Sequence, residues 1–386
     1  MIIIKGEYEF ALNVDGIDLA LGENLLESFL MIEAVMDAVP VCKIVLRDIP
    51  EEINSVGLFD GSRVTVSVRV LNAAGGRNII IPFRIFQIEV EPETHSDKVQ
   101  LWCYYDAPDY LKDAGFEFID GTSSDAAAAI ARKSGLRVDV DQSADSQVWI
   151  RQGMTGYAFL QKVARSAYLN DRSAYAVAVT REGQLRYYNV GGRLSRKPVW
   201  KMRTSDSDAD QLGDDELHID SYVTRIDSGL MNRFSGYGIL SKEFDITTGV
   251  DGTPSDVALT NLEKSTEKLQ INSELTKPPR YEGSPWTLGN THPKYVQATL
   301  QNKRILSTFS TNQKISSTTQ RDVHLLDRVE LQVHANSPER GKFRDFMNGL
   351  YFVDRIATHV TPQDVKFKFN LTREGYNPQR SIGQLL

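Results

Sequence analysis

Cysteine is scarce in this chain, and long apolar runs are missing. Only two residues are cysteines, Cys42 and Cys103. They lie far apart in apolar, strand-like segments without metal-ligand spacing, so we expect two buried thiols. No segment approaches the roughly 18 consecutive apolar residues of a membrane span, and the apolar start Met1–Ile4 is too short for a signal-peptide core. We therefore expect a soluble protein without a membrane span, made in a reducing cytoplasm.

Glycine and proline are also sparse, and cations do not outnumber acids. The 27 glycines and 14 prolines are too few and too scattered for a collagen-like or linker-like chain. The length of 386 residues predicts two to four domains of ordinary globular composition. Lys and Arg total 44 against 51 Asp and Glu, a net charge of −7. This balance argues against a protein that wraps nucleic acid.

Motifs that carry catalysis or cofactor binding are missing as well. The 6 histidines show no paired ligand spacing, and there is no nucleophile elbow, phosphate-binding loop or dinucleotide fingerprint. We predict no catalytic residues, no cofactor, no metal ligands and no enzymatic activity. Because the chain has 51 acids, its sequence does not exclude the pair of catalytic carboxylates that a glycosidase needs. A hydrolase that degrades cell walls is therefore kept as the alternative to a non-enzymatic structural protein, and a glycan-binding β-protein is the third possibility.

The first part of the sequence, residues 1–107, has the pattern of a β domain. Alternate residues are apolar from Val41 to Arg47, and valine takes every second position in Arg63–Val70. Residues 79–90 and 98–105 continue as two strands around a turn. We predict a meander with one half-buried face, suited to a barrel or a sandwich.

Residues 108–200 predict a smaller α/β domain. Ser123-Ser-Asp125 is a helix start signal, Gly135 a stop signal, and Thr155 begins a second, amphipathic helix. Two strands then flank the turn Arg181-Glu-Gly183. A helix, a short strand, a second helix and a hairpin make up this insert.

Two further domains complete the expected organisation. Residues 201–292 predict mixed strands with a long surface excursion, Gly249 to Asn290. Six acids between Ser205 and Glu216 predict a solvated loop, with a calcium loop as the alternative. Residues 293–386 predict a helix followed by a second β module.

The two β ends of the chain resemble each other. Strand-like segments around Val64, Ile85 and Val99 recur in the same order, and at nearly the same spacing, around Val329, Phe352 and Val365. This agreement predicts two copies of one β module flanking an insert.

Short patterns spread in order over the whole chain carry a family resemblance. They are LFDGSRVTV, SDAAAAIARKSGL with TGYAFLQKVARSAY, LLDRVELQV, GLYFVDRIATHV and VKFKFNLTREGYNP. In these patterns the chain resembles the central baseplate hub proteins of phage tails. That family covers the late-control hub proteins of temperate contractile phages and the N-terminal part of type VI secretion spike proteins.

The resemblance implies a fold and a function. The fold would be mainly β with a smaller α/β insert, with two tube-like β-barrel modules per chain, pseudo-hexameric as a trimer. The protein would be a structural baseplate hub in the virion tail, made in the host bacterial cytoplasm. As a homotrimeric ring it would adapt the six-fold tail tube to a three-fold central spike, contact other baseplate proteins, and leave a channel that DNA passes without specific binding. The implied module-core or interface residues are Val64, Val66, Ile85, Leu101, Val329, Leu331, Tyr351, Val353 and Phe369.

The acidic composition also leads to a hypothesis about that channel. A wall that carries the same charge sign as DNA would let the DNA slide past without sticking. We therefore expect an acid-lined lumen.

Overall fold

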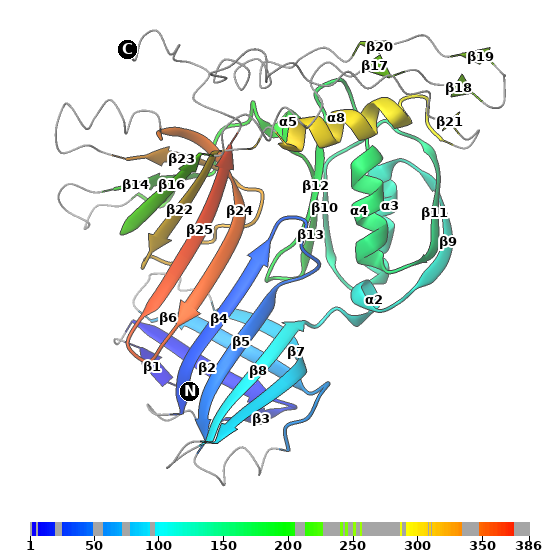
Figure 1. The fold of residues 1–386 in the computed structure, drawn as a ribbon. Coiled ribbons are helices and arrows are strands. Elements are labelled where there is room, and N and C mark those ends of the chain that lie inside the picture. Colours follow the sequence, from blue (N-terminus) through cyan, green and yellow to red (C-terminus); the bar gives the residue numbers. More distant parts are fainter. Residues whose placement is uncertain are drawn as a thin grey trace.

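The computed structural model is dominated by one large, curled sheet, with most of the helices gathered to one side of it (Figure 1). It describes residues 2–4, 7–19, 25–48, 57–71, 78–92, 97–204, 213–226, 291–307, 309, 311–333 and 347–373, with the short strands β17 Leu240–Ser241, β18 Phe244–Asp245, β19 Val250–Asp251, β20 Ser255–Asp256 and β21 Trp286–Thr287. Most of the expected surface excursion and residues 205–212 of the acidic run lie outside the described residues.

The N-terminal strands form the first module. Their bounds are β1 Ile2–Ile4, β2 Tyr8–Val14, β3 Ile17–Asp18, β4 Leu26–Ala34, β5 Val41–Asp48, β6 Arg63–Val70, β7 Asn78–Pro92 and β8 Asp97–Tyr105. Hydrogen bonds join them in the order β2-β6-β7-β8-β5-β4. The alternating valines of β6 are buried at Val64, Val66 and Val68, as the period-two pattern predicts.

The C-terminal strands form a second module with the same central order. Their bounds are β14 Trp200–Arg203, β15 Glu216–His218, β16 Ser221–Ile226, β22 Thr311–Ser317, β23 Arg328–Gln332, β24 Gly349–Val360 and β25 Val365–Arg373. They pair in the order β14-β23-β24-β25-β22-β16. One difference is that β14 lies parallel to β23, whereas β2 lies antiparallel to β6.

The insert between the modules contains most of the helices. Its elements are α2 Pro108–Leu111, β9 Gly115–Gly121, α3 Ser123–Lys133, β10 Arg137–Val140, β11 Gln147–Met154, α4 Gly156–Ser166, β12 Tyr175–Val179, β13 Gln184–Asn189 and α5 Val190–Arg193, and α8 Tyr295–Ser307 packs against α4. Thr122 and Asp125 form a capping box at the start of α3, Gly135 follows that helix with φ +70°, and Thr155 caps α4. The prediction of a mainly β fold with a smaller α/β insert is confirmed.

Strand register confirms the internal repeat residue by residue. Equivalent cross-strand pairs are Val64–Phe83 and Val329–Tyr351, and then Ile85–Cys103 and Val353–Leu371. The sequence comparison had aligned Ile85 with Phe352, whereas register aligns Ile85 with Val353. A slip of one residue would turn every side chain to the opposite face, so only the register alignment is physically possible.

A bulge and a left-handed residue recur in both modules. The pairing of β7 with β8 shifts between Ile85 and Gln87, and that of β24 with β25 shifts between Val353 and Arg355. Gly61 donates its backbone N–H to the carbonyl of Ile85 at φ +90°, and Leu326 donates to that of Val353 at φ +65°. A leucine in this conformation is rare, so its presence at the position equivalent to a glycine indicates a geometry that the module requires.

The expected domain division remains a prediction. Strands β14, β15 and β16, from the expected third domain, pair with strands of the fourth or with each other. In the described residues, no helix is long and apolar enough to cross a membrane.

Candidate subunit interface

The two modules are joined through their strands. β4 of the first module pairs antiparallel with the second half of β24, from Ala34 opposite Arg355 to Phe29 opposite Val360. A continuous antiparallel path of eight strands, β7-β8-β5-β4-β24-β25-β22-β16, therefore runs through both modules. We call the β4–β24 pairing the internal junction.

Each strand of the internal junction has a counterpart in the other module. β16 corresponds to β4, because Val223 pairs with Lys314 of β22 as Leu30 pairs with Lys43 of β5. Residues 87–92 of β7 correspond to residues 355–360 of β24, because Glu91 pairs with Lys98 as His359 pairs with Lys366. These counterparts lie at the two ends of the eight-strand path.

The two ends of this path are exposed. In the described part of the chain, residues 87–92 pair only with β8, and β16 pairs only with β22. Apolar side chains stand open there, with Val90 55% and Val223 63% exposed. Long unpaired edges with exposed apolar residues are templates for pairing with another chain. We call residues 87–92 the β7 edge and β16 the β16 edge.

The nine residues singled out from sequence lie away from these edges, in the core. All nine belong to one hydrophobic cluster that spans both modules, and each is at most 2% exposed. They are Val64, Val66, Ile85, Leu101, Val329, Leu331, Tyr351, Val353 and Phe369. Burial within one chain leaves them no surface for a partner, so the proposed contact belongs to the edge strands.

Hydrogen bonds hold the insert to the loop that follows β4, at the internal junction. Met36, just after β4, has φ +64° and donates its backbone N–H to the carbonyl of Val177, 2.8 Å away. Its own carbonyl accepts hydrogen bonds from Tyr157 Oη and Gln161 Nε2 at 3.1 and 2.7 Å. A short loop after β4 therefore anchors both a strand and a helix of the insert.

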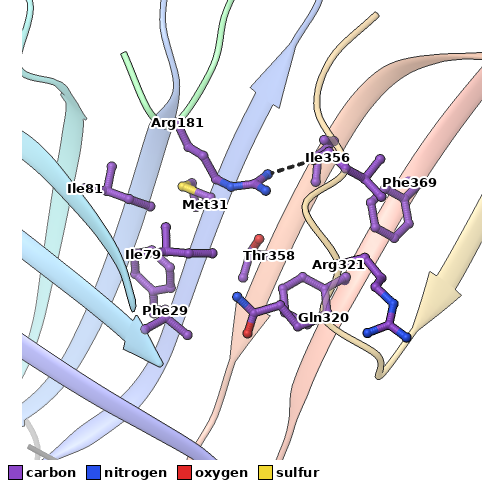
Figure 2. Close-up of a pocket in the computed structure, with 13 residues that line it drawn as sticks. Phe29, Met31, Ile79, Ile81, Arg181, Gln320, Arg321, Ile356, Thr358 and Phe369 are labelled. Atoms are coloured by element: carbon purple, nitrogen blue, oxygen red, sulfur yellow. Dashed lines mark hydrogen bonds between the residues drawn. The ribbon is translucent and has the colours of Figure 1, made fainter. Parts of the chain in front are cut away.

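A buried ion pair also joins the insert to β4. Arg181, in the β12–β13 turn, donates from its backbone N–H and from Nη1 to the two carboxylate oxygens of Glu33, each at 2.7 Å. The side chains are 4% and 0% exposed. Figure 2 shows Arg181 entering between the strands of the two modules. The cavity there holds only about 20 Å³, enough for roughly one water and too small for a ligand.

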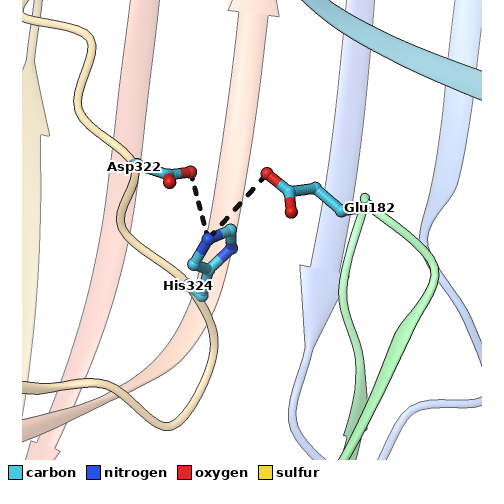
Figure 3. Close-up of side chains that lie close together, drawn as sticks. All are labelled: Glu182, Asp322 and His324. Atoms are coloured by element: carbon cyan, nitrogen blue, oxygen red, sulfur yellow. Dashed lines mark ion pairs between the residues drawn. The ribbon is translucent and has the colours of Figure 1, made fainter. Parts of the chain in front are cut away.

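Next to this pair, two carboxylates face one histidine (Figure 3). His324 Nε2 lies 3.0 Å from Asp322 and 4.0 Å from Glu182. Arginines already engage both acids: Arg137 lies 3.0 Å from Glu182 and Arg181 3.8 Å from Asp322. The three ligand atoms are close enough to hold a metal. The adjoining guanidinium charges oppose a second cation, so the cluster is better explained as an ion-pair network.

The same cluster bears on the hydrolase alternative. Burial acts to raise the pKa of Glu182, but the hydrogen bond from Arg137 and nearby positive charges outweigh it and lower the pKa. A general acid requires the opposite, a raised pKa that keeps its proton near neutral pH. Glu182 therefore does not have the electrostatics of a glycosidase general acid.

Sequence reasoning missed several of these residues. Glu33, Met36 and Arg181 act through contacts between segments far apart in the chain, and no local pattern marks them. Cys42 and Cys103 are both buried, as expected, but they also face each other across β5 and β8. The alternation of apolar residues in the two segments predicts that each cysteine lies on the core face. It does not predict the register between β5 and β8, which decides that the two cysteines stand opposite each other.

The fold and its edges define a class of architecture: a duplicated β module that carries an α/β insert. Comparison with solved structures agrees. The chain is similar to the 43 kDa tail protein of prophage MuSo2 from Shewanella oneidensis, at 13% identity and a TM-score of 0.60, with 95% of this chain and 98% of that chain covered. It is also similar to a tail protein from Neisseria meningitidis, at 13% identity and a TM-score of 0.56, with 97% and 99% covered.

A chain of a VgrG complex has a similar fold. A chain of the Francisella PdpA–VgrG complex matches at 9% identity and a TM-score of 0.50, with 96% of this chain and 59% of that chain covered. No protein-family model and no curated protein matches the sequence. At these identities the likeness shows the fold, and this fold is that of the phage-tail and VgrG-type proteins that the sequence patterns resemble.

Proposed function

We propose that this chain is the structural hub of a phage-tail baseplate or of a related injection machine. In this proposal it forms a homotrimeric ring in the tail between a six-fold tail tube and a three-fold central spike, contacts other baseplate proteins and has no enzymatic activity. The fold shared with tail proteins supports the tail role. The observation that carries the ring is the internal junction and its two unpaired counterparts.

The ring follows from repeating one contact. If the β16 edge of one chain pairs with the β7 edge of the next in the geometry of the internal junction, Val223 stands opposite Glu91 of its neighbour. Three chains of eight strands then close a barrel of twenty-four, with six similar modules around its axis. Closure removes every exposed edge of that path, which is the usual reason for sheets to close.

Paired cysteines test this register. In a Glu91→Cys, Val223→Cys variant, mild oxidation should link neighbouring chains into a covalent trimer of three times 43.3 kDa, with no larger product. The readout is a non-reducing gel of the oxidised protein.

The equivalent positions of the internal junction provide the positive control. Leu30→Cys with His359→Cys occupies a pair observed within one chain, so it should close without a change in mass. A control pair that closes while the Glu91–Val223 pair stays monomeric, at concentrations where the wild type assembles, would reject the proposed interface.

A further inference from the structure

One face of the eight-strand path concentrates positive charge. Because side chains alternate across a strand, the residues between core positions point to the opposite face, which we call the outer-sheet face. Its Lys and Arg residues on the described strands include Lys43, Arg47, Arg84, Lys98, Lys314, Arg355, Lys366 and Lys368, and its acids there include Glu27, Glu89 and Glu91. A chain with net charge −7 thus has a face with the opposite sign.

Two of these lysine positions are repeated in both modules. Lys43 and Lys314 occupy equivalent positions on β5 and β22, and Lys98 and Lys366 do so on β8 and β25. Lys98 is partly neutralised, since Glu91 lies 3.5 Å and Glu27 3.9 Å away. Lys366 is partly neutralised as well, since Asp364 lies 2.9 Å away. The positions therefore repeat, and each lysine of this equivalent pair has a nearby carboxylate.

The second module forms the densest part of this face. Lys314, Arg355, Lys366 and Lys368 are all exposed. Lys314 and Arg355 stand on either side of Asn370, and Lys366 stands opposite His359. Burial, and then the charges of Lys368 and Lys366, lower the pKa of His359. The two lysine charges therefore act on the pKa of His359 in the same direction as its burial, and the carboxylate of Asp364 opposes them.

We propose that the outer-sheet face binds the phosphate backbone of nucleic acid without reading its sequence. Lysines two residues apart on a strand lie roughly 6.6 Å apart, which spreads the positive charge along the sheet rather than concentrating it in a pocket. An extended array of cations suits a ligand whose own charge repeats along its length.

Aromatic residues on the same face favour nucleic acid over an acidic protein. Trp102 carries Lys43 over its ring at 4.6 Å, and Tyr104 follows two residues later on β8. Cations interleaved with aromatic rings are typical of surfaces that hold nucleic-acid strands. In the proposed ring the core layer occupies the other side of the path, while the insert and the segment after α8 reach the outer-sheet face beside Tyr104 and Phe352. The part of this face that carries the lysines of β5, β8, β22 and β25 would then line the lumen. The channel wall would then be basic, the reverse of the acid-lined wall expected from composition.

A salt titration tests the proposal on the full chain. The probe is a fluorescein-labelled 30-base-pair duplex, and the readout is fluorescence anisotropy between 50 and 200 mM NaCl. The Lys314→Gln, Lys366→Gln, Lys368→Gln variant should bind at least tenfold more weakly at 50 mM. Its slope of log K against log salt should be shallower by about 2 to 3, or roughly 0.9 for each lost phosphate contact.

A matched variant controls for net charge. Lys162, Lys197 and Lys294 are exposed and lie outside the outer-sheet face, so their triple Gln variant should bind as the wild type does. Equal losses in the two variants would overturn the proposal. So would binding of polyglutamate in place of the duplex, which would identify an acidic protein as the partner. Light scattering on the same samples reports assembly separately, because a single chain already carries this face.

Discussion

At the scale of single residues, His324 is the side chain whose charge state matters most to the fold. Burial, and then the charges of Arg181 and Arg186, lower its pKa from 6.5 to about 4. The ring is therefore neutral in the folded protein over a range where the unfolded chain would be protonated. Between pH 6.5 and 4 the unfolded state binds more protons, so the free energy of unfolding falls as the pH is lowered.

Replacing this histidine should flatten that pH dependence. In His324→Gln the loss of stability between pH 6.5 and 4 should be smaller than in the wild type by a few kcal/mol at most, about 1.4 kcal/mol for each unit of pKa shift. Urea midpoints at half-unit pH steps provide the measurement. Parallel curves for the two proteins would show that His324 does not couple protonation to folding.

At the scale of elements, local patterns predicted what local forces decide. The alternating valines of β6 and the start signals at Thr155 and Ser123 each describe one segment, and the structure contains all three. The parallel pairing of β14 with β23 and the internal junction depend on segments more than a hundred residues apart. The repeat was visible in sequence, but its exact alignment was not, because the neighbours Phe352 and Val353 are both apolar and both buried, and only the strand register shows which of them lies on the core face.

A charge on the β16 edge should block assembly without unfolding the chain. Val223 is 63% exposed, so Val223→Lys loses little burial in the monomer, and an edge lysine opposes strand pairing. We expect the variant to remain monomeric in light scattering, with its urea midpoint unchanged. Val199→Lys is the control, because Val199 is 56% exposed and lies outside both edges. If Val223→Lys assembles like the control, the β16 edge is not an interface.

At the scale of the whole molecule, each chain contributes a pair of similar modules, and we expect three chains to assemble into one ring. We expect the purified protein, alone or with its spike partner, to scatter light as three times 43.3 kDa. In negative-stain images the particle should be a ring with a central hole and six similar lobes. A stable monomer in the presence of a spike protein would remove the support for a hub, and clearing of peptidoglycan by that monomer would favour the hydrolase alternative.

The internal junction also affects how such a ring would be made. Because one contact in every two forms within a chain, half of the seams close as each chain folds, at the high effective concentration of an intramolecular step. Only three bodies then have to meet, whereas six separate modules would have to find one another at random. The two modules are also free to diverge in sequence, since every ring contains equal numbers of both. Alternate seams of a nearly six-fold ring can thus acquire different surfaces, which is what contact with a three-fold partner requires.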